Sequence, residues 1–335
     1  MTSPKASVIL LTYNQEQFVE EALLSLLNQD MDDLEIVVSD DCSSDSTWGK
    51  IQVVVNAYSG HKKVVTSRNA SNLGIVANYA AGVKKSSGDL IFMAAGDDIS
   101  LPNRCSGTIQ FWRDTQQQYD LVAADAFDMA YDGTILDSKK NDDLETWTVE
   151  KWFESRPFFF GASHMVSRRL LNLAPLNSEL LYEDQCLVFR AILMGGAIRL
   201  PINLVCHRRG GMSQTMGFKF GNRRSDILRH AANELAEVKQ FMSDATLLGK
   251  QSLIETWVTQ KVTYLTPIVR LFQGPVSPKA FGEFWSNETV SVEDKRRYSR
   301  YYFLYPVLAI AHAVRDSLRM LRRDRHTGHI QRSKV

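Results

Sequence analysis

The fold is decided near the amino terminus by the stretch Ser7-Val-Ile-Leu-Leu-Thr-Tyr-Asn-Gln-Glu-Gln-Phe-Val-Glu-Glu-Ala-Leu-Leu-Ser-Leu-Leu27. Its first residues form a short apolar run that ends at polar residues, which is typical of a buried strand. From Glu16 to Gln29 the apolar side chains recur at helical spacing, at positions 18, 22, 23, 26 and 27. The stretch therefore predicts a strand followed by a helix.

The same alternation repeats along the first hundred residues. Apolar runs at 34–38, 63–66 and 89–94 predict further strands, and segments 46–57 and 75–84 predict helices between them. Alternating strands and helices imply a mainly parallel sheet with right-handed crossovers. We therefore expect an α/β fold of Rossmann-like type, with helices flanking the sheet.

Polar side chains follow the predicted strands at the points where these strands end. Residues 12–14 follow the first strand, residues 40–45 the second, and Asp97 and Asp98 the fourth. Ligands of open α/β sheets bind at the carboxyl ends of the strands. We therefore expect these segments to converge on one binding site.

Composition restricts the possible classes of protein. The 335 residues are 44% hydrophobic, enough for a large core with an appendage, and a net charge of +1 gives no overall reason to expect nucleic-acid binding. The four cysteines are scattered without a C-x-x-C pair, so we expect buried free thiols and a cytoplasmic setting. The first residues predict no secretory signal.

Five short motifs occur in order along residues 5–98, and any one of them is a weak signal. They are Ser7 to Asn14, Val38 to Thr47, Asn72-Leu-Gly74, Ser87-Gly-Asp89 and Ala95-Gly-Asp-Asp98. As a set they resemble the family 2 inverting glycosyltransferases, and the resemblance covers about residues 5–215. It implies a GT-A-type α/β fold that transfers a sugar from a nucleotide-diphosphate sugar to an acceptor hydroxyl. It also implies bacterial surface-polysaccharide or O-antigen synthesis.

The resemblance implies two regions of the chain. Residues 1–215 would be the glycosyltransferase domain, with a nucleotide-sugar half at about 1–106 and an acceptor half at about 107–215. Residues 216–335 would form a helical extension, because long helical patterns begin at about residue 220, for example at 227–242 and 253–272. Segment 158–168 resembles the acceptor-side strand, and we assign no chemistry to His164 within it.

The resemblance also implies which residues bind the donor. Asp41 would contact the base or ribose, although residues 40–45 could simply cap the next helix, the role we favour for Asp45. Arg208 and Arg209 belong to a basic loop, 206–213, that would close over the diphosphate. The full nucleotide-sugar set is Thr12, Tyr13, Asn14, Glu16, Asp41, Asn72, Asn78, Asp97, Arg208 and Arg209.

A divalent cation, Mn²⁺ or Mg²⁺, is the implied cofactor, because a leaving diphosphate needs its charge neutralised. The family normally shows Asp-x-Asp, and here Ala95 stands at the first position and Asp97 at the second, metal-binding one. Asp98 could compensate, and His207 could complete the metal shell or be structural. A surface acidic turn is the alternative for Asp97.

Inverting transfer needs one base to take the proton of the acceptor hydroxyl. Asp184 is the candidate, with Glu183 in reserve, because Glu183-Asp184 resembles the family's Glu-Asp pair at the start of a helix. An ordinary helix cap is the alternative. The acceptor would be a saccharide or a lipid-linked saccharide.

Segment 301–314 is apolar and rich in tyrosine, and it lies between basic stretches at 295–300 and 315–325. Such a segment favours an anionic membrane surface, which would make the protein peripheral on the inner face of the plasma membrane. A helix packed on the rest of the protein is the alternative.

Other functions fit the motifs less well. A sugar-nucleotide nucleotidyltransferase needs a glycine-rich loop after the first strand, and segment 10–16 contains no glycine. A non-catalytic nucleotide-sugar binder stays open because of Ala95. A dinucleotide enzyme is disfavoured, since no G-x-G-x-x-G follows a predicted strand.

Overall fold

The computed structural model describes residues 5–210 and 223–304 of the chain. Their contacts divide the chain into two compact units, Met1–Thr215 with Ala236–Val258, and Met216–Leu235 with Thr259–Val335. Helix α9 (Arg223–Leu247) contributes residues to both units. The domain boundary near residue 216 therefore stays a prediction.

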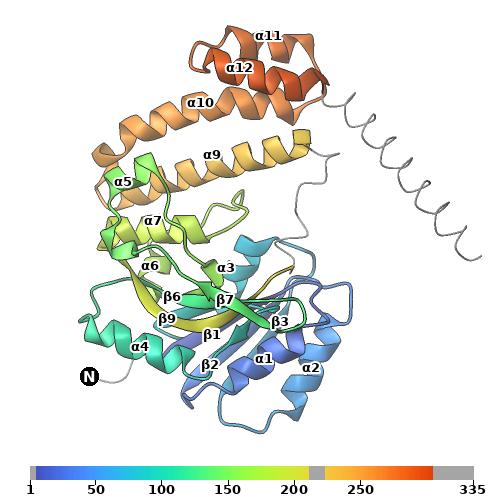
Figure 1. Cartoon of the computed structure of the whole chain (residues 1–335), viewed down its shortest axis with the longest axis vertical. Helices are drawn as coiled ribbons and strands as arrows, with labels where there is room; N and C mark the ends of the chain where they lie inside the picture. Colours follow the sequence, from blue (N-terminus) through green and yellow to red (C-terminus); the bar gives the residue numbers. More distant parts are fainter. Residues whose placement is uncertain (1–4, 211–222, 305–335) are drawn as a thin grey trace, which may run out of the picture. The chain divides into compact units, whose positions relative to one another are not determined.

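The strands of the first unit form one mixed sheet in the order β3-β2-β1-β4-β8-β6-β9-β5, and β7 pairs with β6 (Figure 1). Strands β1 to β4 are parallel, and the later strands β6 and β9 are parallel to each other. Because β8 is antiparallel to both β4 and β6, strands β4 and β6 are parallel to each other. The six strands β1 to β4, β6 and β9 therefore all point the same way. Their bounds are β1 (Ala6–Thr12), β2 (Leu34–Asp40), β3 (Lys63–Arg68), β4 (Leu90–Ala95), β5 (Ile99–Ser100), β6 (Leu121–Met129), β7 (Ile135–Lys139), β8 (His164–Ser167) and β9 (Ala197–Arg208).

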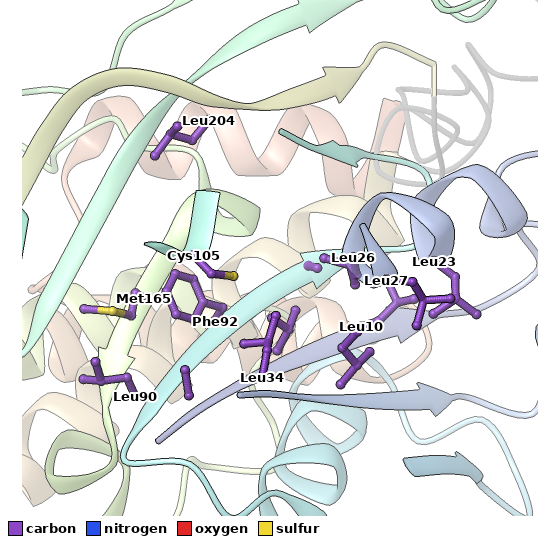
Figure 2. Close-up of a cluster of buried hydrophobic side chains, with 14 of the residues drawn as sticks. Leu10, Leu23, Leu26, Leu27, Leu34, Leu90, Phe92, Cys105, Met165 and Leu204 are labelled. Atoms are coloured by element: carbon purple, nitrogen blue, oxygen red, sulfur yellow. The ribbon is translucent and has the colours of Figure 1, made fainter. Parts of the chain in front are cut away.

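Helices cover both faces of this sheet, as the α/β prediction requires. Alternate residues of β1 point to opposite faces. Leu10 joins a cluster with α1 and α2 (Figure 2), whereas Ile9 faces α3. Helix α3 packs so closely that a side chain at Gly82 would clash with Ile9. The helices of this unit are α1 (Val19–Leu27), α2 (Thr47–Ala57), α3 (Ile75–Lys85), α4 (Arg104–Asp114), α5 (Val149–Glu154), α6 (Arg168–Asn172) and α7 (Asp184–Met194).

The cluster in Figure 2 explains why the apolar runs of the sequence become strands. Leu10, Leu23, Leu26, Leu34 and Phe92 come from strands and helices that follow each other in the chain, and all are buried. Burial of each such side chain contributes roughly 1.5–3 kcal/mol. The α/β prediction is thereby confirmed, with the antiparallel strands β5, β7 and β8 as additions.

The later part of the chain is helical, as expected for the extension. After α9 come α10 (Glu255–Gln273), α11 (Pro278–Ser286) and α12 (Val292–Ser299), followed by a π turn at Arg300–Leu304. None of the helices among residues 5–210 and 223–304 is long and apolar enough to cross a membrane. Most of the predicted membrane-surface segment, residues 305–314, lies outside the described residues.

The cysteines are free thiols among the described residues, and three of them are buried, as predicted. Cys105, Cys186 and Cys206 are buried, whereas Cys42 is half-buried. Burial raises the pKa of the Cys105 thiol to about 12. These thiols therefore act as small apolar side chains in the core.

Candidate functional site

The loops after β1 and β2 are joined by hydrogen bonds at the carboxyl edge of the sheet. The Thr12 hydroxyl donates to Asp40 (3.0 Å), and the Asp41 N–H donates to the Thr12 carbonyl (2.9 Å). Gly96, just after β4, lies against Thr12 and leaves no room for a side chain. Three strand ends predicted to converge therefore do converge.

Asn14 and Glu16 hold the loop between β2 and α2. Asn14 has a positive φ of 51°, and its Oδ1 accepts the Ser44 N–H (2.8 Å). Glu16 Oε2 accepts the Ser46 N–H at 2.9 Å. Tyr13, between them, is half-buried. These side chains shape the site, and their contact with a nucleotide stays a prediction.

Asp41 organises the loop that precedes α3. Its side chain is only 3% exposed, and its carboxylate accepts the N–H groups of Leu73 (2.8 Å) and Gly74 (2.9 Å). It also accepts from the Asn69 amide at 2.9 Å. Gly74 has a φ of +84°, a left-handed conformation that favours glycine. Asp41 therefore fixes the loop through its carboxylate, and the predicted contact with base or ribose is untested.

The two asparagines of the donor set differ in their surroundings. Asn72 is exposed, and its Oδ1 accepts the Gly74 N–H at 3.1 Å. Asn78 is buried, accepts from the Ser39 hydroxyl (2.7 Å) and donates to the Ser39 carbonyl (2.9 Å). Asn78 therefore ties α3 to β2, whereas Asn72 lies at the surface beside the strand ends.

Asp97 and Asp98 follow β4 and have different environments. Asp98 is buried and accepts the Arg208 N–H at 2.9 Å. Burial and the neighbouring charge of Asp97 raise the pKa of Asp98 well above its usual value. Asp97 is half-buried, and its carbonyl accepts from Arg208 Nε at 3.0 Å. Two carboxylates that repel each other here would both be favoured by a nearby cation.

This donor set fits a hard divalent cation. Mg²⁺ and related ions in phosphate sites are held by one or two carboxylates, and phosphate oxygens and water complete the shell. Asp97 supplies such a carboxylate, Asp98 lies next to it, and His207 is close enough for Asp97 to affect its pKa. Within residues 5–210 and 223–304 no group of three or more metal-ligating side chains occurs, so a shell would need oxygens from the diphosphate.

Arg208 is buried and connects several elements of the first unit. Its guanidinium donates to the Tyr131 carbonyl (2.8 Å) and pairs with Glu21 (2.7 Å), and it lies 4.5 Å from the centre of the Phe18 ring. Arg208 thereby ties β9 to α1 and to the end of β4. The sequence analysis missed Glu21, Phe18 and Tyr131 as its partners, because no motif signals contacts so distant in sequence.

Arg209 is the more accessible arginine of the pair. Its guanidinium donates to Asp128 Oδ2 from Nε (3.1 Å) and Nη2 (2.5 Å), and its side chain is half-exposed. Residues 211–213 of the predicted basic loop lie outside the described residues. Of the two arginines, only Arg209 has its guanidinium at the surface.

His207 precedes the arginine pair and lies among polar and aromatic side chains. Its Nδ1 is 3.3 Å from Asp128 Oδ1 and 3.4 Å from Lys139 Nζ, and its ring centre is 4.4 Å from that of Phe160. Burial and the Lys139 charge lower the pKa of His207. The neutral imidazole favoured by these surroundings is the form that binds metals.

Glu183 and Asp184 lie at the start of α7. Burial and the charge of Asp184 raise the pKa of Glu183 to about 8. Burial also raises the pKa of Asp184, to about 6, although the Gln185 N–H counteracts it. At neutral pH the pair therefore carries its negative charge on Asp184. Two carboxyl groups with separated pKa values are typical of acid and base roles.

Buried polar groups near this pair were not predicted. Both ring nitrogens of His164, the Tyr79 hydroxyl and Glu183 Oε2 are buried with no hydrogen-bond partner among the described residues. Burial and the Arg104 charge lower the pKa of His164 to about 3, so it is neutral. Of these groups, only His164 lies in a segment that the sequence motifs indicated, the acceptor-side segment 158–168.

Comparisons with known proteins show which chains are similar to this one. A family model described as Glycosyl transferase family 2 matches residues 7–173. A Campylobacter jejuni protein named GalNAc(5)-diNAcBac-PP-undecaprenol beta-1,3-glucosyltransferase is 35% identical over 108 residues, which cover 32% of this chain and 34% of the relative. The matched segments span 30 to 62% of the length of the curated relatives.

Two solved structures share the fold. S. aureus TarS 1-349 in complex with UDP-GlcNAc is 18% identical with a TM-score of 0.52, and the match covers 83% of each chain. Mannosyltransferase PcManGT from Pyrobaculum calidifontis, in complex with GDP-Man and Mn²⁺, is 14% identical with a TM-score of 0.52, over 93% of this chain and 85% of that one. At such identities the likeness shows the fold alone.

Proposed function

We propose that this chain, whose residues 7–173 form a domain that matches the Glycosyl transferase family 2 model, transfers a sugar from a nucleotide-diphosphate sugar to an acceptor hydroxyl. The observation that carries the proposal is the placing of Asp97 and Asp98 just beyond β4, at the carboxyl edge of the sheet within that domain. Ligands bind at this edge in open α/β sheets. Complexes of two fold neighbours with UDP-GlcNAc and GDP-Man support the class of donor.

We propose that Asp97, with Asp98 and His207 nearby, holds a Mn²⁺ or Mg²⁺ ion. When bound, the ion would neutralise charge on the leaving diphosphate. Asp98 is buried and already accepts the Arg208 N–H, whereas Asp97 is half-buried, so Asp97 is the main ligand. Arg209, with its exposed guanidinium, is the arginine better placed to meet a phosphate, and Arg208 supports it from within.

The proposed mechanism is a single inverting displacement on a hexosyl donor. Asp184 takes the proton of the acceptor hydroxyl as that oxygen attacks the anomeric carbon, and the bond from this carbon to the diphosphate oxygen breaks, so that the nucleoside diphosphate leaves with the bonding electrons. Its pKa of about 6 leaves it ionised at neutral pH yet basic enough to accept the proton. Glu183 stays protonated beside it, so the pair avoids a second buried negative charge.

The proposed setting is synthesis of a surface polysaccharide or O-antigen on a saccharide or lipid-linked acceptor. The name of the Campylobacter jejuni relative, which includes PP-undecaprenol, supports a lipid-linked acceptor. We propose a cytoplasmic protein in which residues 216–335 bring the domain to the inner membrane surface. The exposed side chains of Arg296, Arg297 and Arg300 would favour anionic lipids there.

A second candidate function is favoured by one residue. Ala95, in place of the first acidic residue of Asp-x-Asp, removes a carboxylate that contacts ribose or metal in the resembling family. The chain could then bind a nucleotide-sugar without transferring it. Retention of Asp97 and of a base-like Asp184 supports the enzyme instead.

A donor screen tests the proposal and separates the two candidates. Thermal unfolding is measured with UDP, GDP, CDP and dTDP, with and without Mn²⁺, because a ligand stabilises the state that binds it. We expect one nucleotide to raise Tm, and more so with Mn²⁺. The matching nucleotide-sugar is then assayed for release of nucleoside diphosphate in the presence of saccharide acceptors. Stabilisation without release would indicate a binder, and no stabilisation by any nucleotide would refute the proposal.

A further inference from the structure

We propose that Lys139, Phe158 and Phe160 form a subsite for an acceptor sugar that carries an anionic substituent, either a carboxylate or a phosphate. The proposal rests on the proposed glycosyltransferase function and names the class of acceptor for that same site. The resemblance of segment 158–168 to the acceptor-side strand gives no role to Lys139 and does not indicate an anionic acceptor. Four features of the molecule support it.

The first feature is contact with the proposed base. Segment 157–161 packs on the start of α7, where the Gln185 side-chain amide donates to the Pro157 carbonyl at 3.3 Å. A Cβ at Gly161 would lie 3.2 Å from Asp184 Oδ2, so the backbone at this glycine borders the carboxylate. An acceptor whose hydroxyl reaches Asp184 would therefore come close to this segment.

The second feature is contact with the donor end of the site. The Phe160 ring is 4.4 Å from the His207 ring, centre to centre, and the charge of Asp97 is near enough to act on His207. Phe160 thus adjoins His207, a proposed metal ligand, and precedes Gly161, which borders the proposed base. An acceptor that bridges these two groups would have its ring beside Phe160.

The third feature is a rigid frame that holds the aromatic rings. The Phe158 N–H donates to Asp142 Oδ2 (2.8 Å), and the Phe158 carbonyl accepts the Asp142 N–H (2.9 Å). The Phe160 N–H donates to Asn141 Oδ1 (2.7 Å), and Asn141 is buried and bonded to β6 through Asp125 (2.9 Å). The segment that carries the two rings therefore loses little conformational freedom when a ligand binds.

One of these rings is open to a ligand. Phe158 is 49% exposed, although its backbone is held at both its N–H and its carbonyl. The face of an aromatic ring is electron-rich, so it attracts the weakly positive C–H groups on one face of a pyranose. The exposed ring therefore suits a sugar better than a purely polar group.

The fourth feature is a cation without an ion pair. Lys139 Nζ lies 5.5 Å from the centre of the Phe158 ring and 5.1 Å from that of Phe160. No carboxylate of the described residues pairs with it within 4.0 Å. Asp128 is bound by Arg209 (2.5 Å), and Asp142 accepts the Phe158 N–H.

The charged groups around Lys139 determine which kind of ligand group would bind beside it. The strand register pairs Asp137 of β7 with Asp128 of β6, and Asp128 with His207 of β9, so these side chains share one face with Lys139. Asp137 is exposed and remains solvated. Lys139 is half-buried, and an anionic ligand group would compensate for hydration that its ammonium group loses when a ligand covers it. A neutral sugar would gain only the stacking contacts.

Lys140 provides a matched control. It adjoins Lys139, is exposed, and has no ion pair or ring contact in the part of the chain that the structure describes. Lys140→Gln removes the same charge at nearly the same place in the sequence. A general effect of net charge on binding would therefore be the same for the two variants.

The test uses matched sugar probes on the full chain with the preferred nucleoside diphosphate and Mg²⁺, which is diamagnetic and leaves the NMR signals of the probes sharp. Saturation-transfer NMR compares methyl glucoside with methyl glucuronoside and glucose 1-phosphate, and methyl galactoside with methyl galacturonoside and galactose 1-phosphate. We expect an anionic probe to bind about tenfold tighter than its neutral partner, a difference of about 1.4 kcal/mol. Preference for the uronosides or for the phosphates identifies the anionic group.

The variants separate charge from stacking. Lys139→Gln should abolish the preference for anionic probes, whereas Lys139→Arg and Lys140→Gln should keep it. Phe158→Leu should weaken the binding of the neutral and anionic probes by a similar factor, within whichever set of probes, glucose-based or galactose-based, binds more tightly. Each variant should bind the nucleoside diphosphate with wild-type affinity, which also shows that it is folded.

The proposal is overturned if neutral and anionic probes bind equally, if no probe binds, or if Lys140→Gln loses the preference as Lys139→Gln does. Nucleotide binding is recorded in the same samples. Nucleotide binding without the predicted probe behaviour refutes the subsite alone. Failure of the wild-type chain to bind any nucleotide refutes the proposed function and the subsite together.

Discussion

The pKa values of carboxyl groups are shifted in opposite directions at the two ends of the sheet. At the amino end, Glu35 of β2 is 6% exposed and accepts from the Ser7 hydroxyl (2.5 Å), Lys63 Nζ (2.7 Å) and the Ser87 N–H (2.6 Å). Burial alone would raise its pKa, but these hydrogen bonds outweigh burial and lower the pKa to about 2. Glu35 therefore holds β1, β2, β3 and the start of β4 together.

At the carboxyl end, buried carboxyl groups have fewer partners and lie beside one another. Burial raises the pKa of Glu183 to about 8, that of Asp184 to about 6, and that of Asp98 well above its usual value. Structural ion pairs lower such pKa values, whereas raised values in a cluster are typical of functional sites. The difference indicates that the amino end serves stability and the carboxyl end serves chemistry.

The largest expected effect is at Asp184. Asp184→Asn should lower the rate of sugar transfer by about a thousandfold, because an amide cannot accept the proton of the acceptor hydroxyl. Nucleoside diphosphate affinity should change by less than about twofold, since the shape is kept. Steady-state transfer assays and calorimetric titration measure the two quantities. Transfer near the wild-type rate would place the base elsewhere, with Glu183 next in line.

The pH dependence of transfer follows from the pKa of about 6 at Asp184. The base must be ionised, so kcat/KM should fall about tenfold per pH unit below pH 6 and level off above it. Rates measured from pH 5 to pH 9 test this expectation. A limb near pH 8 would instead identify Glu183 as the base, because its pKa is raised to about 8.

Glu35→Gln should destabilise the fold without affecting the site. The pKa of Glu35 falls from 4.5 to about 2 on folding, so its contribution is present above pH 4.5 and is lost as the pH falls through 2. Allowing for the exposed Lys63 partner, we expect a loss of about 2 kcal/mol at pH 7 in urea unfolding. The difference from wild type should narrow below pH 4. Reduced nucleotide affinity in this variant would contradict the inference that the amino end serves stability and the carboxyl end serves chemistry.

Glu183→Gln should have the opposite effect on stability. The pKa of Glu183 is raised from 4.5 to about 8 on folding, so wild-type stability falls as the pH rises from 4.5 through 8. A neutral amide avoids that loss, so the variant should gain about 3 kcal/mol of stability relative to wild type between pH 5 and pH 8. Thermal unfolding at the two pH values measures this. A variant less stable than wild type at pH 8 would show that ionised Glu183 has a stabilising partner.

The fold could be predicted in its first half because its signals are local. The runs at 7–11, 34–38 and 63–66 became β1, β2 and β3, each with its own apolar pattern and a helix after it where expected. Strands β6, β8 and β9 pair across long stretches of chain, and no local pattern reveals an antiparallel insertion. The apolar pattern therefore predicts strands, whereas their pairing depends on tertiary contacts.

The candidate site was predictable where a residue directly follows a strand or begins a helix. Thr12, Asp41 and Asp97 lie at strand ends as the motifs indicate. The partners Glu21, Tyr131 and Asp128 could not be predicted, because they meet Arg208 and Arg209 only through the fold. The buried state of Arg208 was missed for the same reason.

The most direct test of the difference between the two ends is metal-dependent donor binding at Asp97. Calorimetric titration of the preferred nucleoside diphosphate, with and without Mn²⁺, compares wild type, Asp97→Ala and Glu35→Gln. We expect Mn²⁺ to raise affinity at least about tenfold in wild type and in Glu35→Gln, and not in Asp97→Ala, which loses the main carboxylate ligand. An undiminished effect of Mn²⁺ in Asp97→Ala would contradict a metal-dependent donor site at the carboxyl end of β4.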